Sequence, residues 1–566
     1  MHLPTAPGPR LALLAVAWAA SATVSLSGSS SQVTVLDPVF VEASSTTGTP
    51  WQYLSTPGFE IISRCPYTFN AAFVRALEKS EAARLALLPA PFWGDIPTPI
   101  EIVLYDRAPE NPDGIVATKP IDLSWSPEDS ALVGASGMQL THPVSVGDGS
   151  TFINCGNYWD IVSNGGDFSV DVDSQIRLSM RTPRFPSWFV EGLEGPCGLY
   201  SNRVVKTTAT GDTLILTNAL WTSSSETLAL RADSMKRAKE GSPVPARTIM
   251  PLDELLGGHI PSGETGLWNA QVGLFVRWGL CRFPHRQAFL DFVLQATREP
   301  VTEPMFTKAL GLSFAEAERQ LADYLPEAAS TSINIHLDIP AADSLSVRDA
   351  SQLEVARIIG GWGRLEGRPS GSIPTAYEDE CLAQASKLFE KSLARGPTEP
   401  NFLASFGLYA LQVGDRARGT KALEDAIAAG VICPRAYVEL ARVRLEDALP
   451  YVSGGLGDLT PSQYNDIVGL LTVARHQMPS LASAYYLLER VMEHAPTRPE
   501  RAELFALDDA MRLFPQDAVL AYHVATLYRR LGYDDDARAI VARATGFVET
   551  ERGRALLLAY PAQTGR

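Results

Sequence analysis

The sequence predicts an α+β domain followed by an all-α helical solenoid. Two observations predict this: β-rich runs flank a helical stretch near the start, and the last third repeats small and large residues at helical spacing. A chain of 566 residues is also too long for one ordinary domain. With 45% hydrophobic and 20% charged residues, it can bury full-size cores.

Residues 1–22 read as a secretory signal peptide. His2 and Arg10 precede the uncharged run 11–26, and Ala20-Ser21-Ala22 is a small-x-small cleavage site that would leave Thr23 at the mature start. We therefore expect a bacterial protein that is secreted or periplasmic. An uncleaved anchor is the alternative, although the run is short for a bilayer. We expect no integral membrane domain beyond this segment.

Residues 33–328 form the predicted α+β domain. The runs 58–65 and 99–105 are rich in β-formers and bounded by turn residues, and the stretch 69–88 between them has helical spacing. Strand, helix, strand is the simplest account. The pattern turns helical from residue 265, and Ser313 with Glu316 predicts a capping box for the last helix.

Residues 329–375 are expected to be a linker with the first helical elements, and alternating apolar residues from Ile333 to Ile339 predict a short strand in it. Residues 376–566 carry units of the tetratricopeptide (TPR) type. The residues expected to pack these units are Leu403, Phe406, Gly407, Ala410, Gly414, Ala426, Ala525, Tyr528, Gly532, Ala537 and Ala544. Stacked helix pairs bind proteins or peptides on their concave face, so we expect a partner of that kind.

One stretch, "RTPRFPSWFVEGLEGPCGLY" at 181–200, suggests a metal site. With the strands 58–65 and 99–105 and the helices after 265, it resembles the peptidase MA-like (gluzincin) family. The resemblance covers about residues 55–325 and implies a zincin-like fold. It places Trp188, Phe189, Glu191, Gly192 and Leu193 in the segment that supplies the third zinc ligand, which would be Glu191.

In that family two histidines of an H-E-x-x-H helix complete the zinc site, and its glutamate acts as general base. This chain contains no H-E-x-x-H, and no histidine lies between His142 and His259. Asp171 or Asp173 could bind a hard cation only weakly. We therefore predict no catalytic residue, no metal and no cofactor, and expect that the protein is not an enzyme. The alternative is a metal-dependent hydrolase with an atypical zinc site around Glu191.

Without zinc, the segment is expected to persist for packing. Pro186 and Ser187 can begin a short helix with Ser187 as its cap, and Gly195-Pro196 should end it. Phe189 and Leu193, four residues apart, would face the core. We expect the carboxylate of Glu191 to cap or hydrogen-bond neighbouring backbone. Core packing is also expected for the tryptophans of this domain, Trp159, Trp188, Trp221, Trp268 and Trp278.

Other chemistries have less support. The net charge of −16 argues against nucleic acid as a partner. The six cysteines, Cys65, Cys155, Cys197, Cys281, Cys381 and Cys433, form no C-x-x-C motif and read as small buried residues. One bridge, Cys155–Cys197, is possible in an exported protein. A thiol dyad of Cys155 or Cys197 with His142, His259 or His285 has no spacing to support it.

Taken together, the sequence predicts an exported, non-catalytic, peptidase-like protein with a TPR protein-interaction module. The hydrolase with an altered site is the second hypothesis. A third is an envelope-bound assembly factor, in which the signal segment is retained as an anchor.

Overall fold

A computed structural model provides the structure of the chain. It describes residues 50–93, 98–104, 141–144, 152–154, 177–178, 180–195, 197–199, 203–208, 211–216, 249–257, 265–282, 284, 286–337, 339, 345–367, 376–449 and 456–560. Outside these residues lie the predicted signal peptide and Cys155, Trp159, Asp171, Asp173, Trp221, His259 and His285.

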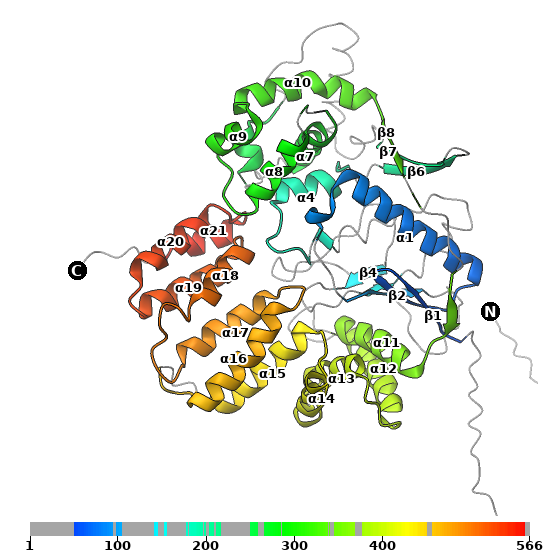
Figure 1. Ribbon diagram of the computed structural model, residues 1–566, viewed down its shortest axis with the longest axis vertical. Coiled ribbons are helices and arrows are strands. Elements are labelled where there is room, and N and C mark those ends of the chain that lie inside the picture. Colours follow the sequence, from blue (N-terminus) through cyan, green and yellow to red (C-terminus); the bar gives the residue numbers. More distant parts are fainter. Residues whose placement is uncertain are drawn as a thin grey trace, which may run out of the picture. The chain divides into compact units, whose positions relative to one another are not determined.

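A mixed six-stranded sheet lies in the first part of the described chain (Figure 1). Its strands are β1 (Gln52–Thr56), β2 (Phe59–Ser63), β3 (Ile100–Leu104), β4 (Thr141–Val144), β5 (Phe152–Asn154) and β9 (Val347–Asp349), in the order β4-β5-β3-β2-β1-β9. β2, β3 and β5 run parallel, and β1, β4 and β9 pair antiparallel. The parallel pair β2–β3 requires a crossover, which α1 (Tyr67–Leu87) supplies. The predicted strand–helix–strand unit is confirmed.

Helices cover both faces of this sheet. Because successive strand residues point to opposite faces, Ile61 joins the core under α1 while Ile62 joins a second core with Val103. That second core is closed by Ile358, Ile359, Trp362 and Leu365 of α11 (Gln352–Glu366). The segment after the α+β domain therefore packs its first helix directly on the sheet.

A second sheet is three-stranded and antiparallel, in the order β6 (Arg203–Thr208), β7 (Gly211–Leu216), β8 (Ile333–Leu337). The strand predicted from the alternation after Ile333 is confirmed. It pairs with β7 across more than a hundred residues of sequence, from Asp212↔Leu337 to Leu216↔Ile333. The segment 329–375 thus contributes one strand to each sheet, β8 here and β9 to the larger one.

A helical cluster is built from two helices that precede β6 in sequence and from the helices between β7 and β8. It consists of the short η1 (Ala90–Phe92) from upstream, α4 (Ser187–Glu194), α6 (Leu252–Leu256), α7 (Thr265–Arg277), the π-helical turn η4 (Trp278–Arg282), α8 (Arg286–Ala296), α9 (Glu303–Leu310) and α10 (Phe314–Ser330). The capping box at α10 is confirmed: Ser313 Oγ accepts from the N–H of Glu316, whose carboxylate accepts from the N–H of Ser313 at 2.8 Å.

The last third is an array of antiparallel helix pairs (Figure 1). The pairs are α11 with α12 (Ala376–Leu393), α13 (Pro400–Gln412) with α14 (Arg416–Ala428), α15 (Pro434–Ala448) with α16 (Pro461–His476), α17 (Ala482–Glu493) with α18 (Phe505–Leu513) and α19 (Ala518–Arg530) with α20 (Asp534–Thr545), followed by α21 (Glu551–Leu558). The sequence predicted TPR-type packing positions on α13, α14, α19 and α20, and the first helical elements before residue 376. It did not predict that α11 and α12 already form the first pair.

The array has an inner and an outer layer. Each first helix of the array packs on the first helix of the next pair, and the last of them packs on α21. These contacts are closer than those between successive second helices. The first helices are α11, α13, α15, α17 and α19. The more closely packed layer of a solenoid lies on its concave side. We call this layer of first helices the inner layer. No helix among the described residues is long and apolar enough to span a bilayer.

The predicted TPR packing positions lie in or beside the array's cores. Phe406, Gly407, Ala410, Ala426, Ala525, Tyr528, Ala537 and Ala544 are buried, and Leu403 is half-buried. Gly414 and Gly532 stand in the turns of two pairs with φ of 86° and 78°, a left-handed conformation that only glycine adopts without strain. These small buried residues and glycine turns let the two helices of a pair approach each other closely.

Candidate functional site

The segment around Glu191 forms α4, but it does not begin as the sequence predicted. Pro186 is the N-cap residue, and Ser187 is the first helical residue, with no capping bond from either side chain. The expectation that Ser187 caps this helix is therefore wrong. Instead, the N–H of Ser187 donates to Glu549 Oε1 at 2.9 Å, so a carboxylate from the turn after α20 caps α4. A carboxylate at this end also interacts favourably with the helix dipole.

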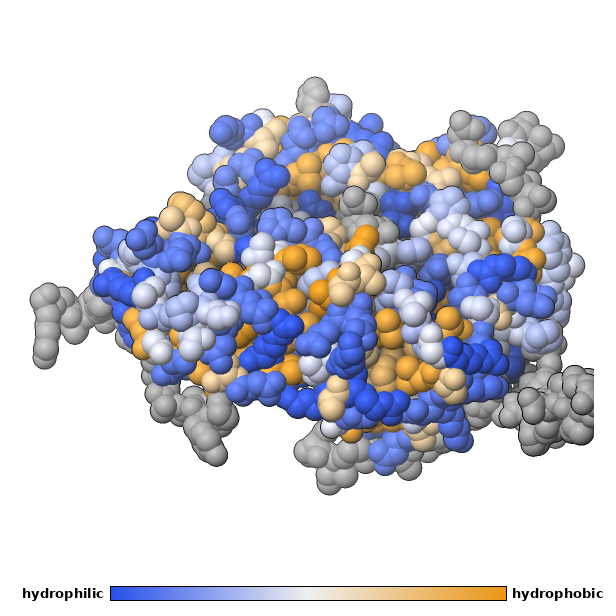
Figure 2. Space-filling view, turned by 60° about the horizontal axis from the view of Figure 1, so that its bottom comes forward, coloured by the Kyte–Doolittle hydropathy of each residue, from blue (hydrophilic) through white to orange (hydrophobic). Residues whose placement is uncertain are grey.

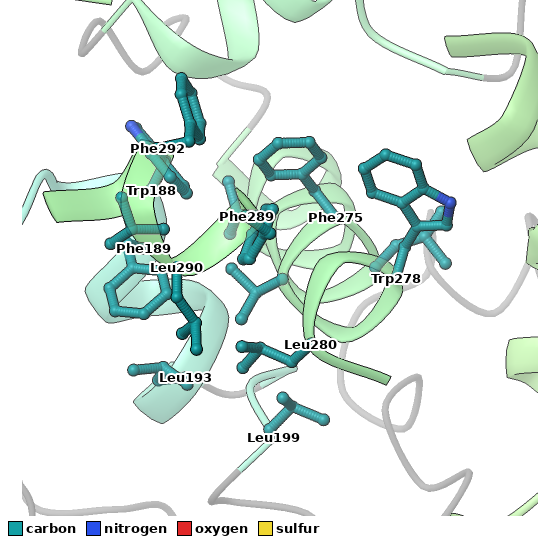
Figure 3. Packing of buried hydrophobic residues seen from close by; sticks show 14 of the residues in the cluster. Trp188, Phe189, Leu193, Leu199, Phe275, Trp278, Leu280, Phe289, Leu290 and Phe292 are labelled. Atoms are coloured by element: carbon teal, nitrogen blue, oxygen red, sulfur yellow. The ribbon is translucent and has the colours of Figure 1, made fainter. Parts of the chain in front are cut away.

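The apolar residues of α4 lie at the centre of the helical cluster (Figure 3). Trp188, Phe189 and Leu193 are fully buried. The ring of Trp188 stacks on Phe292 at 5.9 Å and meets Phe275 edge-on at 5.5 Å. Trp268 and Trp278 are buried in the same cluster, so core packing is confirmed for the three tryptophans that the structure describes.

Gly192 lets α4 approach α7 closely. A Cβ at this position would lie 2.7 Å from the carbonyl oxygen of Val272 and would also overlap Val276. The glycine of the E-G-L sequence therefore has a packing role that requires no metal. As predicted, the helix stops at Glu194, with Gly195 as C-cap.

The Glu191 carboxylate is half-buried, and no hydrogen bond to it occurs within the described part of the chain. The expectation that it bonds neighbouring backbone is therefore not met. Burial raises the pKa of Glu191. Burial also raises the pKa of Glu549. The hydrogen bonds from Ser187 lower that pKa, and the negative charge of nearby Glu191 raises it. Two poorly solvated carboxylates thus lie near one another at one helix.

Among the described ranges, no three His, Cys, Asp or Glu side chains come together as metal ligands would. Zinc sites use at least three such protein ligands. The contacts that the structure describes for α4 are those of helix capping and core packing.

The end of the array contacts the α4 segment and the turn before α9. Gln516 Nε2 donates to the carbonyl of Phe185 at 3.3 Å, and Arg543 Nη2 donates to the carbonyl of Arg298 at 3.0 Å. Together with the Glu549–Ser187 bond, these contacts place residues more than 240 positions apart side by side. They were not detectable in the sequence, because none follows a local period or motif.

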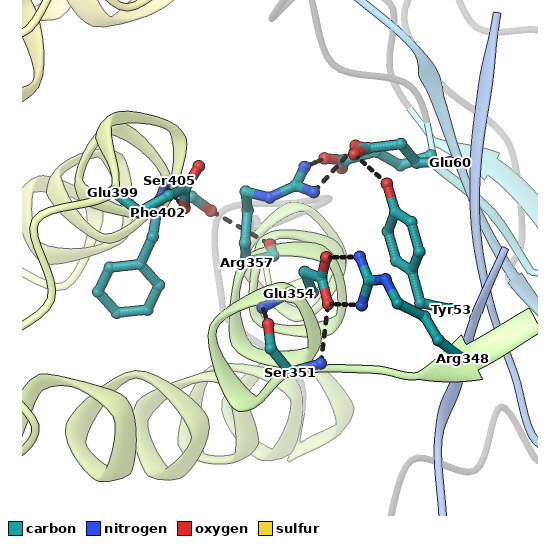
Figure 4. Close-up of polar contacts among 10 residues, drawn as sticks. Tyr53, Glu60, Arg348, Ser351, Glu354, Arg357, Glu399, Phe402 and Ser405 are labelled. Atoms are coloured by element: carbon teal, nitrogen blue, oxygen red, sulfur yellow. Dashed lines mark hydrogen bonds and ion pairs between the residues drawn. The ribbon is translucent and has the colours of Figure 1, made fainter. Parts of the chain in front are cut away.

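A buried ionic cluster joins the start of the array to the sheet (Figure 4). Arg357 of α11 bonds Glu60 of β2 at 2.9 Å and also bonds Glu101 of β3. The Tyr53 hydroxyl donates to Glu60 at 2.6 Å. Burial raises the pKa of Glu101 to about 7 against the attraction of Arg357, whose own pKa the two carboxylates raise. Because this cluster joins α11 to β2 and β3, it anchors α11 to the sheet.

In the described part of the chain, no disulfide forms at Cys65, Cys197, Cys281, Cys381 or Cys433. A Cys155–Cys197 bridge is therefore not formed. Burial raises the pKa of Cys197 and of Cys281 to about 11, so neither is a reactive thiolate at neutral pH.

The inner layer exposes charged and aromatic side chains. On α15, Glu439 accepts from Arg435 at 3.1 Å and from Arg442 at 2.7 Å. On the face in Figure 2, hydrophilic residues surround smaller hydrophobic areas. Exposed large apolar residues occur singly on different elements: Val413 follows α13, Phe505 lies on α18 outside the inner layer, and Leu558 lies on α21. Such a surface is more suited to polar recognition than to a purely apolar interface.

The fold and these contacts define an α+β domain carrying a TPR-like array of helix pairs. No family model matches the chain, and no curated protein matches it. Solved structures of MamA are similar over part of it: one at 16% identity covers 29% of this chain and 88% of its own, with a TM-score of 0.23, and another at 16% identity covers 38% and 98%, with a TM-score of 0.26.

A thermophilic TPR protein of Thermus thermophilus is similar at 18% identity, over 32% of this chain and 93% of its own, with a TM-score of 0.23. These likenesses fit a TPR-like region, but at such scores they carry no argument about function.

Proposed function

We propose that this is an exported, non-catalytic protein that binds a protein or peptide through the inner layer of its TPR-like array. The observation that supports the proposal most is the array itself, whose stacked first helices expose polar and aromatic side chains on one side. Helical repeats of this architecture create extended concave binding surfaces. Export rests on the N-terminal sequence alone, with its basic start, apolar run and Ala20-Ser21-Ala22 site.

On this proposal the α+β domain keeps a peptidase-like outline without peptidase chemistry. The support is the role that each described residue of the α4 segment has without metal: Trp188, Phe189 and Leu193 fill the core, and Gly192 allows the contact with α7. Glu191 is then a half-buried carboxylate beside Glu549, and it is not a ligand.

Position-specific photocrosslinking tests the interaction function. A photoreactive residue would replace Arg442 on α15 of the inner layer or, as matched controls, Lys421 on α14 and Arg538 on α20 of the outer layer. All three side chains are exposed, by 42%, 71% and 57%. Crosslinks to one defined protein from Arg442 alone support the proposal, whereas equal crosslinking from all three positions, or from none, contradicts it.

Two further measurements test the other parts. N-terminal sequencing of protein from the cell envelope should give a start near Thr23, and a full-length chain in the cytoplasm would contradict export. Metal analysis of the purified protein and of Glu191→Gln should give no stoichiometric zinc in either. Zinc present in the first and lost in the second would establish the hydrolase alternative.

A further inference from the structure

The inner layer contains a largely buried carboxyl group to which no described residue donates a hydrogen bond. The side chain of Glu489, on α17, is 6% exposed, and no hydrogen bond to it occurs among the residues that the structure describes. His523 Nδ1, on α19, lies 4.0 Å from Glu489 Oε2, which is too long for a hydrogen bond. Buried polar groups are normally hydrogen-bonded, so an exception of this kind calls for a reason.

The charges around Glu489 do not provide a counter-ion. Arg530 of α19 already bonds Glu493, one turn further along α17. Burial, and after it the charge of Glu493, raise the pKa of Glu489 to about 8, because Arg530 and the exposed Arg490 oppose them only in part. At neutral pH the folded chain therefore holds Glu489 largely protonated.

Aromatic rings border the accessible side of this group. The side chain of His523 is 52% exposed, and the rings of Tyr486 and Tyr522 each meet it edge-on at 6.2 Å. The hydroxyl of Tyr486 donates to Asp517 at 2.7 Å, which holds its ring in place. Tyrosine faces attract cations, and Asp517 and Glu493 add negative charge nearby. We call Tyr486, Glu489, Tyr522 and His523 the Glu489 site.

We propose that the Glu489 site binds a lysine side chain of a peptide partner, with the Glu489 carboxylate as counter-ion and the flanking rings packed along the lysine stem. This deepens the proposed function, on which it rests, by naming the recognised group. A compact ammonium with three donors suits one buried carboxylate better than a planar guanidinium does. The acidic balance of the chain, −16, is complementary to a basic partner.

The proposal has a proton balance that can be measured. Glu489 binds the ammonium as a carboxylate, so the carboxylic proton leaves to solvent as the ion pair forms. Binding near pH 7 should therefore release close to one proton, and affinity should rise with pH up to about 8 and then level off. A His523→Gln variant is a further control, because proton release from Glu489 should persist in it.

The experiment begins with selection of a random peptide library on the immobilised full chain. Lysine should be enriched at one position on the native chain and on Glu446→Gln, a matched control on α15, and not on Glu489→Gln. A selected peptide and its lysine→norleucine twin are then titrated calorimetrically in two buffers of different ionisation enthalpy. We expect the twin to bind about tenfold or more weakly to the native chain, because a charge-assisted bond is lost. The two peptides should bind Glu489→Gln equally, without proton release.

The outcomes separate the two proposals. Peptides that bind the native chain and Glu489→Gln alike, or that bind without proton release, overturn the lysine site and leave the interaction function standing. If no peptide is selected on the native chain and the inner layer gives no crosslink, both are overturned. Circular dichroism of each variant establishes that it is folded before binding is compared.

Discussion

Removing the charge of Arg357 should detach the start of the array from the sheet. Arg357→Met keeps most of the side-chain volume but leaves Glu60 and Glu101 facing each other, at 20% and 14% exposure, without their cation. Breaking a buried ion pair by removing one partner costs about 3–5 kcal/mol. We expect a loss of that size at pH 8.

The loss should depend on pH in a defined direction. The folded-state pKa of Glu101 is raised to about 7 from its ordinary value of 4.5, so the folded chain holds a proton that the unfolded chain releases between these values. Stability therefore falls as pH rises through this window. Without Arg357 the folded-state pKa rises further, because the attraction that opposed burial is gone. The variant should thus lose less at pH 5 than at pH 8.

Hydrogen exchange of the full chain, read by mass spectrometry at both pH values, measures the effect locally in β2, β3 and α11. It avoids the assumption that so long a chain unfolds in one step. Arg348→Met is the matched control, because Arg348 pairs with Glu354 at 53% exposure and an exposed pair contributes about 1 kcal/mol or less. A loss below 1 kcal/mol at pH 8, or an equal loss at both pH values, would refute the reasoning.

Three other changes test the remaining packing and electrostatics. Gly192→Ala should destabilise the helical cluster by about 1–3 kcal/mol in urea denaturation, because its Cβ would overlap α7, and an unchanged midpoint would remove the close-approach role. Ser313→Ala should cost about 1 kcal/mol through loss of the α10 capping box, seen as faster exchange in its first turn; unchanged exchange there would contradict this. The folded-state pKa of Glu489 is raised to about 8, so the stability of the array should fall from about pH 4.5 to pH 8, by at most about 1.4 kcal/mol per unit. Glu489→Gln should flatten that fall, and parallel stability curves for the two proteins would show that Glu489 does not hold the proton.

Local patterns predicted the elements, and long-range contacts escaped prediction. The run of β-formers in 58–65 and the helical spacing after residue 69 identified β2 and α1, because both signals act within a few neighbouring residues. Ser187 was misassigned as a cap, since a serine before an apolar run is a common signal, whereas the actual acceptor, Glu549, lies 362 residues away. Nothing in the sequence of α17 distinguishes Glu489 from an exposed glutamate. Only the packing of α19 against α17 buries it.

The resemblance of the α4 segment to a ligand-bearing helix has a physical explanation that does not involve zinc. Trp188 and Gly192 pack this helix on α7, and Phe189 and Leu193 fill the same buried cluster, so each has a packing role that requires no metal. Glu191 is the one residue of the pattern for which the described contacts supply no packing reason.

The position of α11 limits how the protein can be divided. A fragment that stops before residue 352 would leave Ile62 and Val103 facing water, and a fragment that starts there would expose Ile358, Ile359 and Trp362. Each fragment would therefore expose an apolar surface. The first would also keep Glu60 and Glu101 without Arg357, and the second would keep Arg357 without them. A cut after residue 366 would do no better, because Ala356 of α11 also packs with Phe389 of α12 and Phe402 of α13, so the sheet, α11 and the array should be expressed together.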